Sequence, residues 1–263
     1  MDIKIYQVDA FASKVFEGNP AAVCPLDSWL CDDILQKIAQ ENNLSETAFF
    51  VPNGQGFHLR WFTPKEEVEL CGHATLAAAH VLFQHLNFTH NTIEFMTLSG
   101  KLAVSRVASG YSMSFPASVA TPLEPSVLLQ QGLGVTPKQV LKAFDYIVVL
   151  ENEAQVKTIT PDYSKLQQLD LRGVVVTAPG DEVDFVSRCF FPKLDVNEDP
   201  VTGSAHCELA PFWAKMFNRT NLVGKQLSQR TGIVNCQVQD KRVILLGQAV
   251  DYMTGTITIN ESI

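Results

Sequence analysis

The chain has 263 residues and a formal net charge of −8, with 46% hydrophobic and 18% charged residues. This length and composition predict a globular protein of two domains and exclude a disordered chain. An acidic surface repels nucleic acid and anionic membranes, so we expect neither as a partner.

The N-terminus and the cysteines predict a cytoplasmic protein. The first residues, MDIKIYQVDAF, lack a basic segment followed by an apolar run, and no later stretch is apolar enough to span a bilayer. The six cysteines show no CxxC spacing, which is typical of reduced thiols rather than of a disulfide framework.

The first half of the chain carries one helix of unusual composition. An amphipathic helix is predicted over residues 28–41, followed by a short strand, ETAFFV, at 46–51. The segment 72–86, GHATLAAAHVLFQHL, is apolar on nearly all sides, which predicts a helix buried on every face. Antiparallel strands around such a helix indicate a sheet wrapped around it.

The Pro- and Ser-rich stretch FPASVATPLEPS, at 115–126, predicts a boundary between domains at 1–117 and 118–263. Two strands and one helix are predicted in the second half, at 173–178, 231–238 and 203–217. Pro211 lies inside that helix and indicates a kink or a late start. The terminal strand GTITI, at 255–259, is a candidate to cross to the first domain.

Several landmarks of the first half recur in the same order in the second. RWFTPK at 60–65 recurs as RCFFPK at 188–193, and SGKLAVSRV at 99–107 has a counterpart in TGIVNCQV at 231–238. Each RxFxPK-type segment follows an apolar strand and precedes an acidic loop and a helix rich in small residues. We interpret this pattern as an internal duplication that produces two similar α+β domains.

The two predicted buried helices begin alike, with CGHAT at 71–75 and TGSAH at 202–206. A helix N-terminus offers unpaired N–H groups and a partial positive charge, and glycine lets a ligand approach the backbone. Two such starts facing each other across a domain cleft could hold a small carboxylate-bearing molecule. The alternative is that both glycines only permit tight packing of helix against strand.

Three titratable residues lie near these helix starts. Glu46 precedes a strongly apolar strand, which makes it a candidate acid–base, although a lone strand-edge glutamate usually faces solvent. Asp199 precedes the second helix, where an N-terminal cap is a strong alternative. His73 lies one residue inside the first helix and could equally be a core histidine bound to a carbonyl.

Metal and nucleophile chemistry find little support in the sequence. Cys71, His73, His206 and Cys207 make a formal Cys₂His₂ set, but zinc spacings such as CxxC or HxxxH are missing, so we expect no metal site. A direct hydrogen bond between Cys71 and His73 is not expected, because residues two apart at a helix start point in different directions. No GxSxG, P-loop or GxGxxG motif is found.

Four segments resemble the signatures of the PhzF-like (phenazine biosynthesis-like) family, which shares its fold with diaminopimelate epimerase. They are VDAFASKVFEGNPAAV (8–23), ENNLSETAFF (41–50), LRWFTPKEEVELCGHATLAAA (59–79) and NEDPVTGSAH (197–206). The resemblance runs in order from Val8 to the C-terminus. It implies two pseudo-symmetric domains, each an antiparallel barrel-like sheet around a central helix, with the active site in the cleft between them.

The resemblance also implies roles for particular residues. The catalytic glutamate of the family falls on Glu46, and the histidine and aspartate of its motifs fall on His73 and Asp199. The serine of its TGSA motif falls on Ser204. Together with Ser204, the substrate-binding candidates of this sequence are Asn19, Cys71, Gly72, Thr202, Gly203, Arg230 and Gly232. Related epimerases use a cysteine before each helix start. Here Thr202 takes the second position, which puts a two-thiol mechanism in doubt.

The sequence therefore predicts a cofactor-independent isomerase that moves a proton on a small anionic, carboxylate-bearing metabolite by general acid–base catalysis. Developing charge would be stabilised by the N–H groups of Gly72, His73, Gly203 and Ser204. No metal, nucleotide or pyridoxal is required. The alternatives are a non-catalytic metabolite-binding protein of the same fold and a Cys71-dependent racemase or epimerase. A homodimer is left open as the assembly.

Overall fold

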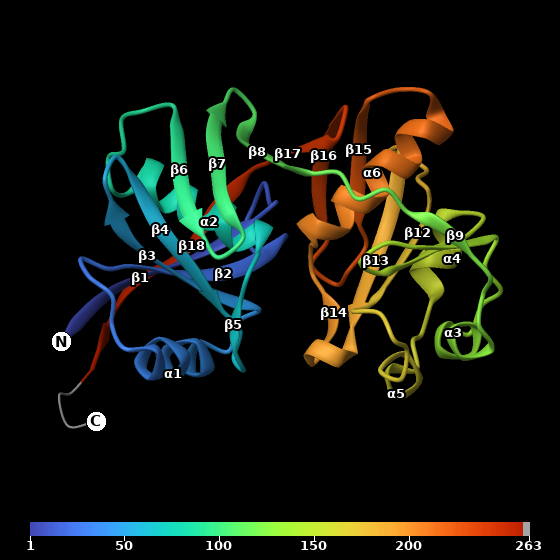
Figure 1. Cartoon of the computed structure of the whole chain (residues 1–263), viewed down its shortest axis with the longest axis horizontal. Helices are drawn as coiled ribbons and strands as arrows, with labels where there is room; N and C mark the ends of the chain where they lie inside the picture. Colours follow the sequence, from blue (N-terminus) through green and yellow to red (C-terminus); the bar gives the residue numbers. More distant parts are fainter. Residues whose placement is uncertain (260–263) are drawn as a thin grey trace. The chain divides into compact units, whose positions relative to one another are not determined.

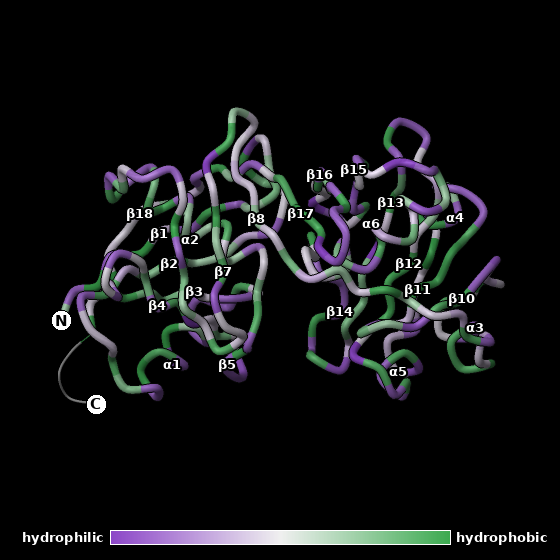
Figure 2. The backbone as a smooth tube through the Cα atoms, turned by 45° about the horizontal axis from the view of Figure 1, so that its top comes forward, coloured by the Kyte–Doolittle hydropathy of each residue, from purple (hydrophilic) through white to green (hydrophobic). Residues whose placement is uncertain are grey.

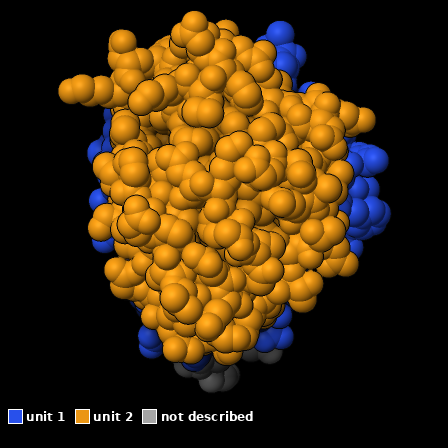
Figure 3. Space-filling view, turned by 90° about the vertical axis from the view of Figure 1, so that its right-hand side faces the viewer, with its two compact units in different colours: residues 1–114, 246–263 blue, residues 115–245 orange. Residues whose placement is uncertain are grey.

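The computed structural model describes residues 1–259 and has a mixed α+β architecture (Figure 1). Contacts divide the chain into two compact units, coloured separately in Figure 3. Unit 1 holds residues 1–114 together with the segment that starts at Leu246, and unit 2 holds residues 115–245. Among the described residues, no helix is both long and apolar enough to cross a membrane.

Unit 1 is a sheet of mostly antiparallel strands with two helices. Its elements are β1 (Asp2–Ala10), β2 (Asn19–Pro25), α1 (Asp32–Asn42), β3 (Glu46–Asn53), β4 (Gly56–Phe62), β5 (Glu67–Val68), α2 (Gly72–Gln84), β6 (Thr92–Thr97), β7 (Gly100–Val107), β8 (Gly110–Pro116) and β18 (Ala249–Thr258). Two pairs, β2–β3 and β4–β6, run parallel. The late strand β18 pairs antiparallel with β1 along almost its whole length.

Helix α2 lies in the core of unit 1, as its composition predicts. Every residue from His73 to Phe83 is buried, and the helix contacts β1, β2, β3, β7 and β18. Its run of alanines keeps the helix thin enough for strands to approach on several sides. By contrast, α1 buries only Leu35, Ile38 and Ala39 and covers an outer face of the sheet. Figure 2 shows how hydrophobic and hydrophilic segments alternate along the backbone.

Unit 2 has the same kind of architecture. Its elements are β9 (Thr121–Leu123), α3 (Val127–Leu133), β10 (Gln139–Lys142), β11 (Tyr146–Val149), α4 (Glu153–Thr158), α5 (Tyr163–Leu166), β12 (Val174–Pro179), β13 (Phe185–Phe191), the 3₁₀ turn η1 (Pro192–Leu194), β14 (Val196–Asp199), α6 (Gly203–Phe217), β15 (Asn221–Gln226), β16 (Gly232–Gln239) and β17 (Arg242–Gly247). Here β11–β12 and β13–β15 are the parallel pairs.

The two units share one order of strand pairing. From β2 to β7 the pairings run parallel, antiparallel, antiparallel, parallel and antiparallel, and β11 to β16 repeat this series. The match extends to side chains. Arg60 of β4 forms a bidentate pair with Glu67 of β5, and Arg188 of β13 does the same with Glu198 of β14. Both arginines belong to the repeated motif, which supports the interpretation as a duplication.

Helix α6 passes through Pro211 without ending. Proline lacks the N–H that would bond to the carbonyl four residues earlier, which is that of Cys207. That carbonyl instead accepts a hydrogen bond from the backbone N–H of Ser118, at 3.0 Å. The helix starts at Gly203, so the proline does not delay it.

Candidate active site

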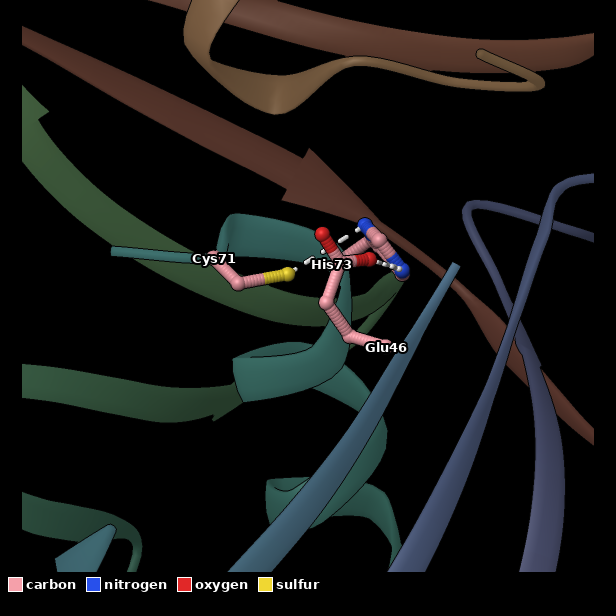
Figure 4. A group of neighbouring side chains, drawn as sticks. All are labelled: Glu46, Cys71 and His73. Atoms are coloured by element: carbon pink, nitrogen blue, oxygen red, sulfur yellow. Dashed lines mark hydrogen bonds and ion pairs between the residues drawn. The ribbon is translucent and has the colours of Figure 1, made fainter. Parts of the chain in front are cut away.

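Glu46 and His73 form a buried acid–base pair in unit 1 (Figure 4). Glu46 is the first residue of β3, where β3 pairs with Ala21 of β2, and His73 is in the first turn of α2. Oε2 of Glu46 lies 3.1 Å from Nε2 of His73, and the two side chains are 18% and 6% exposed. The strand-edge alternative, in which Glu46 faces solvent, is therefore wrong.

The other ring nitrogen of His73 faces Asn19 and Cys71. The amide nitrogen of Asn19 donates to Nδ1 at 3.3 Å, and Sγ of Cys71 lies 3.5 Å from the same atom. An imidazole nitrogen that accepts a hydrogen bond carries no proton. In the neutral ring the proton is therefore on Nε2, the nitrogen that lies 3.1 Å from the Glu46 carboxylate.

The contact between Cys71 and His73 contradicts the expectation from their spacing. Cys71 is the N-cap of α2 and has an extended backbone, with φ −143° and ψ 108°, so helical directions do not apply to its side chain. From this position the thiol turns toward the imidazole. The expectation failed because it assumed that both residues were helical.

Burial has the largest effect on the pKa of the Cys71 thiol, whereas the neighbouring groups decide the direction of the pKa shift of the His73 imidazole. Burial, together with the nearby carboxylate of Glu46, raises the pKa of Cys71 to about 11. Burial opposes charge on His73, but the adjacent Cys71 and Glu46 outweigh it and raise the pKa of the imidazole above its ordinary value. At neutral pH the thiol is therefore protonated and a poor base, whereas Glu46 and His73 are placed to share a proton.

In unit 2 the segment before α6 is held by Gln226, which the sequence reading missed. Its Oε1 accepts the backbone N–H of Thr202 at 2.8 Å, and its Nε2 donates to the carbonyl of Asp199 at 2.7 Å. The hydroxyl of Thr202 donates to the Asp199 carboxylate. Gln226 is the last residue of β15, in which alternate residues are buried. A polar residue at a buried position of this strand could have indicated its role from the sequence.

Asp199 is not the N-cap of α6. The N-cap is Thr202, whose own side chain forms no capping hydrogen bond. Asp199 is 9% exposed and stands at the end of β14, so the cap alternative for this residue is wrong.

The remaining predicted residues of unit 2 lie around the same segment. The hydroxyl of Ser204 accepts from Arg172, which also forms a bidentate pair with buried Asp145. The turn that carries Arg230 and leads into Gly232 is tied to this segment by Ser228. The Ser228 hydroxyl donates to the carbonyl of Pro200 and accepts the N–H of Thr231.

The starts of α2 and α6 differ from those of α3, α4 and α5. Ser126, Asn152 and Asp162 cap α3, α4 and α5 with side-chain hydrogen bonds. Neither Cys71 nor Thr202 caps its helix, and neither first turn contains an acidic residue. Such starts leave backbone N–H groups available for an anion.

The predicted residues thus gather into two groups. In unit 1, Asn19, Glu46, Cys71, Gly72 and His73 surround the start of α2. In unit 2 the group around the start of α6 comprises Asp199, Thr202, Gly203, Ser204, Arg230 and Gly232.

The donor set of the first group also matters for metal chemistry. The ligand atoms of Glu46, Cys71 and His73 lie within 4.8 Å of one another. The sequence predicts that the formal Cys₂His₂ set does not bind metal. One of its members, His206, forms a hydrogen bond in unit 2 instead. Its Nδ1 bonds to the carbonyl of Thr202, and burial lowers the pKa of this histidine to about 4.

The chain is similar in sequence and in fold to known proteins. The family model for phenazine biosynthesis-like proteins matches residues 8–255. An uncharacterized isomerase of Pseudomonas aeruginosa is 49% identical, over 98% of this chain and 99% of its own. A PhzF-family crystal structure from Enterococcus faecalis has a TM-score of 0.96 and 48% identity, covering 98% of this chain and 100% of its own.

These likenesses define first a class and then a family. The fold class is epimerase-like, since a hydroxyproline epimerase from Agrobacterium vitis aligns with a TM-score of 0.63 at 8% identity, over 99% of this chain and 94% of its own. Within that class, the chain belongs to the phenazine biosynthesis-like family. The predicted α+β fold and the family resemblance are both confirmed.

Proposed function

We propose that this protein is a cofactor-independent isomerase that moves a proton on a small carboxylate-bearing metabolite, with Glu46 as the acid–base group. The observation that carries the proposal is the buried Glu46–His73 pair at the uncapped start of α2. The isomerase names of relatives at 49%, 47% and 44% identity support the reaction class.

The proposed reaction needs only proton transfers. The carboxylate of Glu46 takes a proton from a C–H bond made acidic by an adjacent carboxylate or enamine. The electron pair of that bond moves into the conjugated system, and the negative charge gathers on a substrate oxygen near the N–H groups of Gly72 and His73. Glu46 then returns the proton to a different carbon or face, and the charge is lost.

His73 acts as the partner of Glu46 in this scheme. Its Nε2 lies 3.1 Å from Oε2 of the carboxylate, and Asn19 holds the opposite nitrogen. The neighbouring Cys71 and Glu46 raise the pKa of this imidazole above its ordinary value despite burial, which shows that the ring and the carboxylate interact. We therefore assign the imidazole the role of orienting Glu46.

Asp199 and the start of α6 form the second half of the proposal. We propose that the groups at the starts of α2 and α6 act on one substrate in the predicted interdomain cleft. Asp199 and Thr202 would orient the substrate end opposite Glu46, and the N–H groups of Gly203 and Ser204 would bind its anionic group.

The Cys71-dependent alternative is disfavoured by the thiol itself. A thiol with a pKa near 11 is protonated at neutral pH, and position 202 supplies no second thiol. The binding-protein alternative keeps the same residues and differs only in the absence of turnover.

A panel of small carboxylic acids incubated with the protein in D₂O separates catalysis from binding. The panel should include amino acids and unsaturated acids, and proton NMR should follow each compound. An isomerase incorporates deuterium into at least one compound or rearranges it, and Glu46→Gln stops that change. Saturable binding of a panel member that exchanges no proton would instead support the binding protein.

A further inference from the structure

A second cluster of ligating side chains lies at the other end of α2, away from Glu46. It comprises His80 in the last turns of α2, His85 at the C-cap and Asp251 on β18. Their ligand atoms all lie within 4.8 Å of one another. Nε2 of His80 is 3.2 Å, and Nε2 of His85 2.9 Å, from the same oxygen, Oδ1 of Asp251.

Each ligand is held in place by a different element. Nδ1 of His80 lies 2.9 Å from the hydroxyl of Tyr111, and the ring of His85 packs against Tyr6 with centroids 4.7 Å apart. Asp251 stands opposite Val8, where a bulge between Gln7 and Val8 shifts the register of β1 and β18. Bulges re-aim side chains, and preorganised ligands of this kind are what a metal site requires.

We propose that His80, His85 and Asp251 bind one divalent transition-metal ion, for which zinc is the natural probe. Two imidazoles and one carboxylate suit such ions, and three protein ligands leave a position open to water. Two ligands about 2.0–2.1 Å from a tetrahedral ion stand roughly 3.3 Å apart, close to the separations found here. The ion would bind Nε2 of both imidazoles and Oδ1 of Asp251, and each neutral imidazole would carry its proton on Nδ1.

Burial and exposure fit this role. The side chain of His80 is 8% exposed, while those of His85 and Asp251 are 27% and 44% exposed, so an ion can enter from solvent. With the ion bound to Nε2 of His80, the Nδ1–H of the same ring can donate a hydrogen bond to the Tyr111 oxygen. This arrangement is usual for histidines that bind metal ions. Burial also lowers the pKa of His80, despite the opposing effect of Asp251.

The bound ion would fasten β18 onto unit 1. Asp251 is 166 residues from His85 in sequence, and β18 is the strand that returns to this unit after unit 2. No local spacing could have revealed the site, because its third ligand comes from that distant strand. The site is independent of the proposed isomerase reaction.

Zinc titration of chelator-treated full-length protein tests the proposal, with calorimetry as the readout. We expect one equivalent to bind, His85→Ala and Asp251→Asn each to lose at least about tenfold in affinity, and Tyr111→Phe to lose about 10–100-fold. The matched control, His90→Ala, removes an exposed imidazole outside the cluster and should bind as the wild type does.

Two further measurements guard against misfolded variants and other sites. Cobalt should give a visible spectrum without a thiolate charge-transfer band, and zinc at a hundred times its Kd should raise the wild-type melting temperature by roughly 5 °C or more. The proposal fails if the wild type binds no zinc, or if His85→Ala and Asp251→Asn bind it unchanged. It also fails if Cys71→Ala abolishes binding, which would locate the ion at Glu46 and His73.

Discussion

His73 acquires its properties from neighbours that sequence reading could place only in part. The apolar strand after Glu46 and the family motif predicted a functional glutamate, and the structure brings it to the imidazole. The thiol contact was missed because it depends on the extended backbone of Cys71. Gln226 was missed because its role depends on two backbone groups that meet only in the folded chain.

The cysteines should differ strongly in reactivity. Cys31 is exposed and the other five are buried, and burial raises the pKa of Cys71 to about 11 and that of Cys207 to about 12. Because only thiolates react, iodoacetamide at pH 7.5 should label Cys31 first, as mass spectrometry can show. Cys31→Ser should lack the fast phase. Labelling of Cys71 as fast as Cys31 would contradict the assignment of a protonated thiol.

Glu208 should make stability depend on pH. The side chain is fully buried in α6, and burial together with Asp145 raises its pKa to about 8, against the opposing effect of Arg172. The folded state therefore binds a proton that the unfolded state releases. This contribution is present below the unfolded pKa near 4.5 and is lost as the pH rises to about 8.

Glu208→Gln keeps the neutral shape and removes this dependence. Relative to the wild type, the variant should gain roughly 2–4 kcal/mol of unfolding free energy between pH 5 and pH 9, as measured by urea denaturation. Parallel pH profiles for the two proteins would show that Glu208 is ionised in the folded state across this range.

At the level of elements, composition and the repeat predicted the two central helices well. The all-round apolar pattern placed α2 within a few residues of its observed bounds, and the repeat placed α6 as its counterpart. The amphipathic helix expected from residue 28 begins only at Asp32, where two aspartates suit the first turn. The effect of Pro211 on the helix could not be predicted from the sequence. The carbonyl that the proline leaves without its helical donor is satisfied by Ser118, which comes from another segment of the chain.

Gln226 should hold the start of α6. Gln226→Ala would leave the buried N–H of Thr202 and the carbonyl of Asp199 without their partner, which costs roughly 2–4 kcal/mol of unfolding free energy. Asn235→Ala, at an exposed position of β16, is the control and should change stability by no more than about 0.5 kcal/mol. Equal effects of the two substitutions on urea denaturation would remove the proposed role of Gln226.

At the scale of the whole molecule, the repeated motif predicted more than any single element did. The matching Arg–Glu pairs and pairing series follow from residues visible in the sequence. The return of β18 to β1 was anticipated only for residues 255–259, whereas the strand begins at Ala249. Its extent depends on pairing with the opposite end of the chain, which no local pattern encodes. The domain bounds and the roles of the site residues remain predictions.

The most direct test of the account compares Glu46→Gln with Cys71→Ala for deuterium incorporation into a substrate found in the D₂O panel. Loss of the ionisable group should slow exchange by about 10²–10⁴-fold in Glu46→Gln, with folding and ligand binding nearly unchanged. Cys71→Ala should cost far less, because its thiol is protonated. Exchange at the wild-type rate in Glu46→Gln, together with an inactive Cys71→Ala, would contradict the account and assign the chemistry to the thiol.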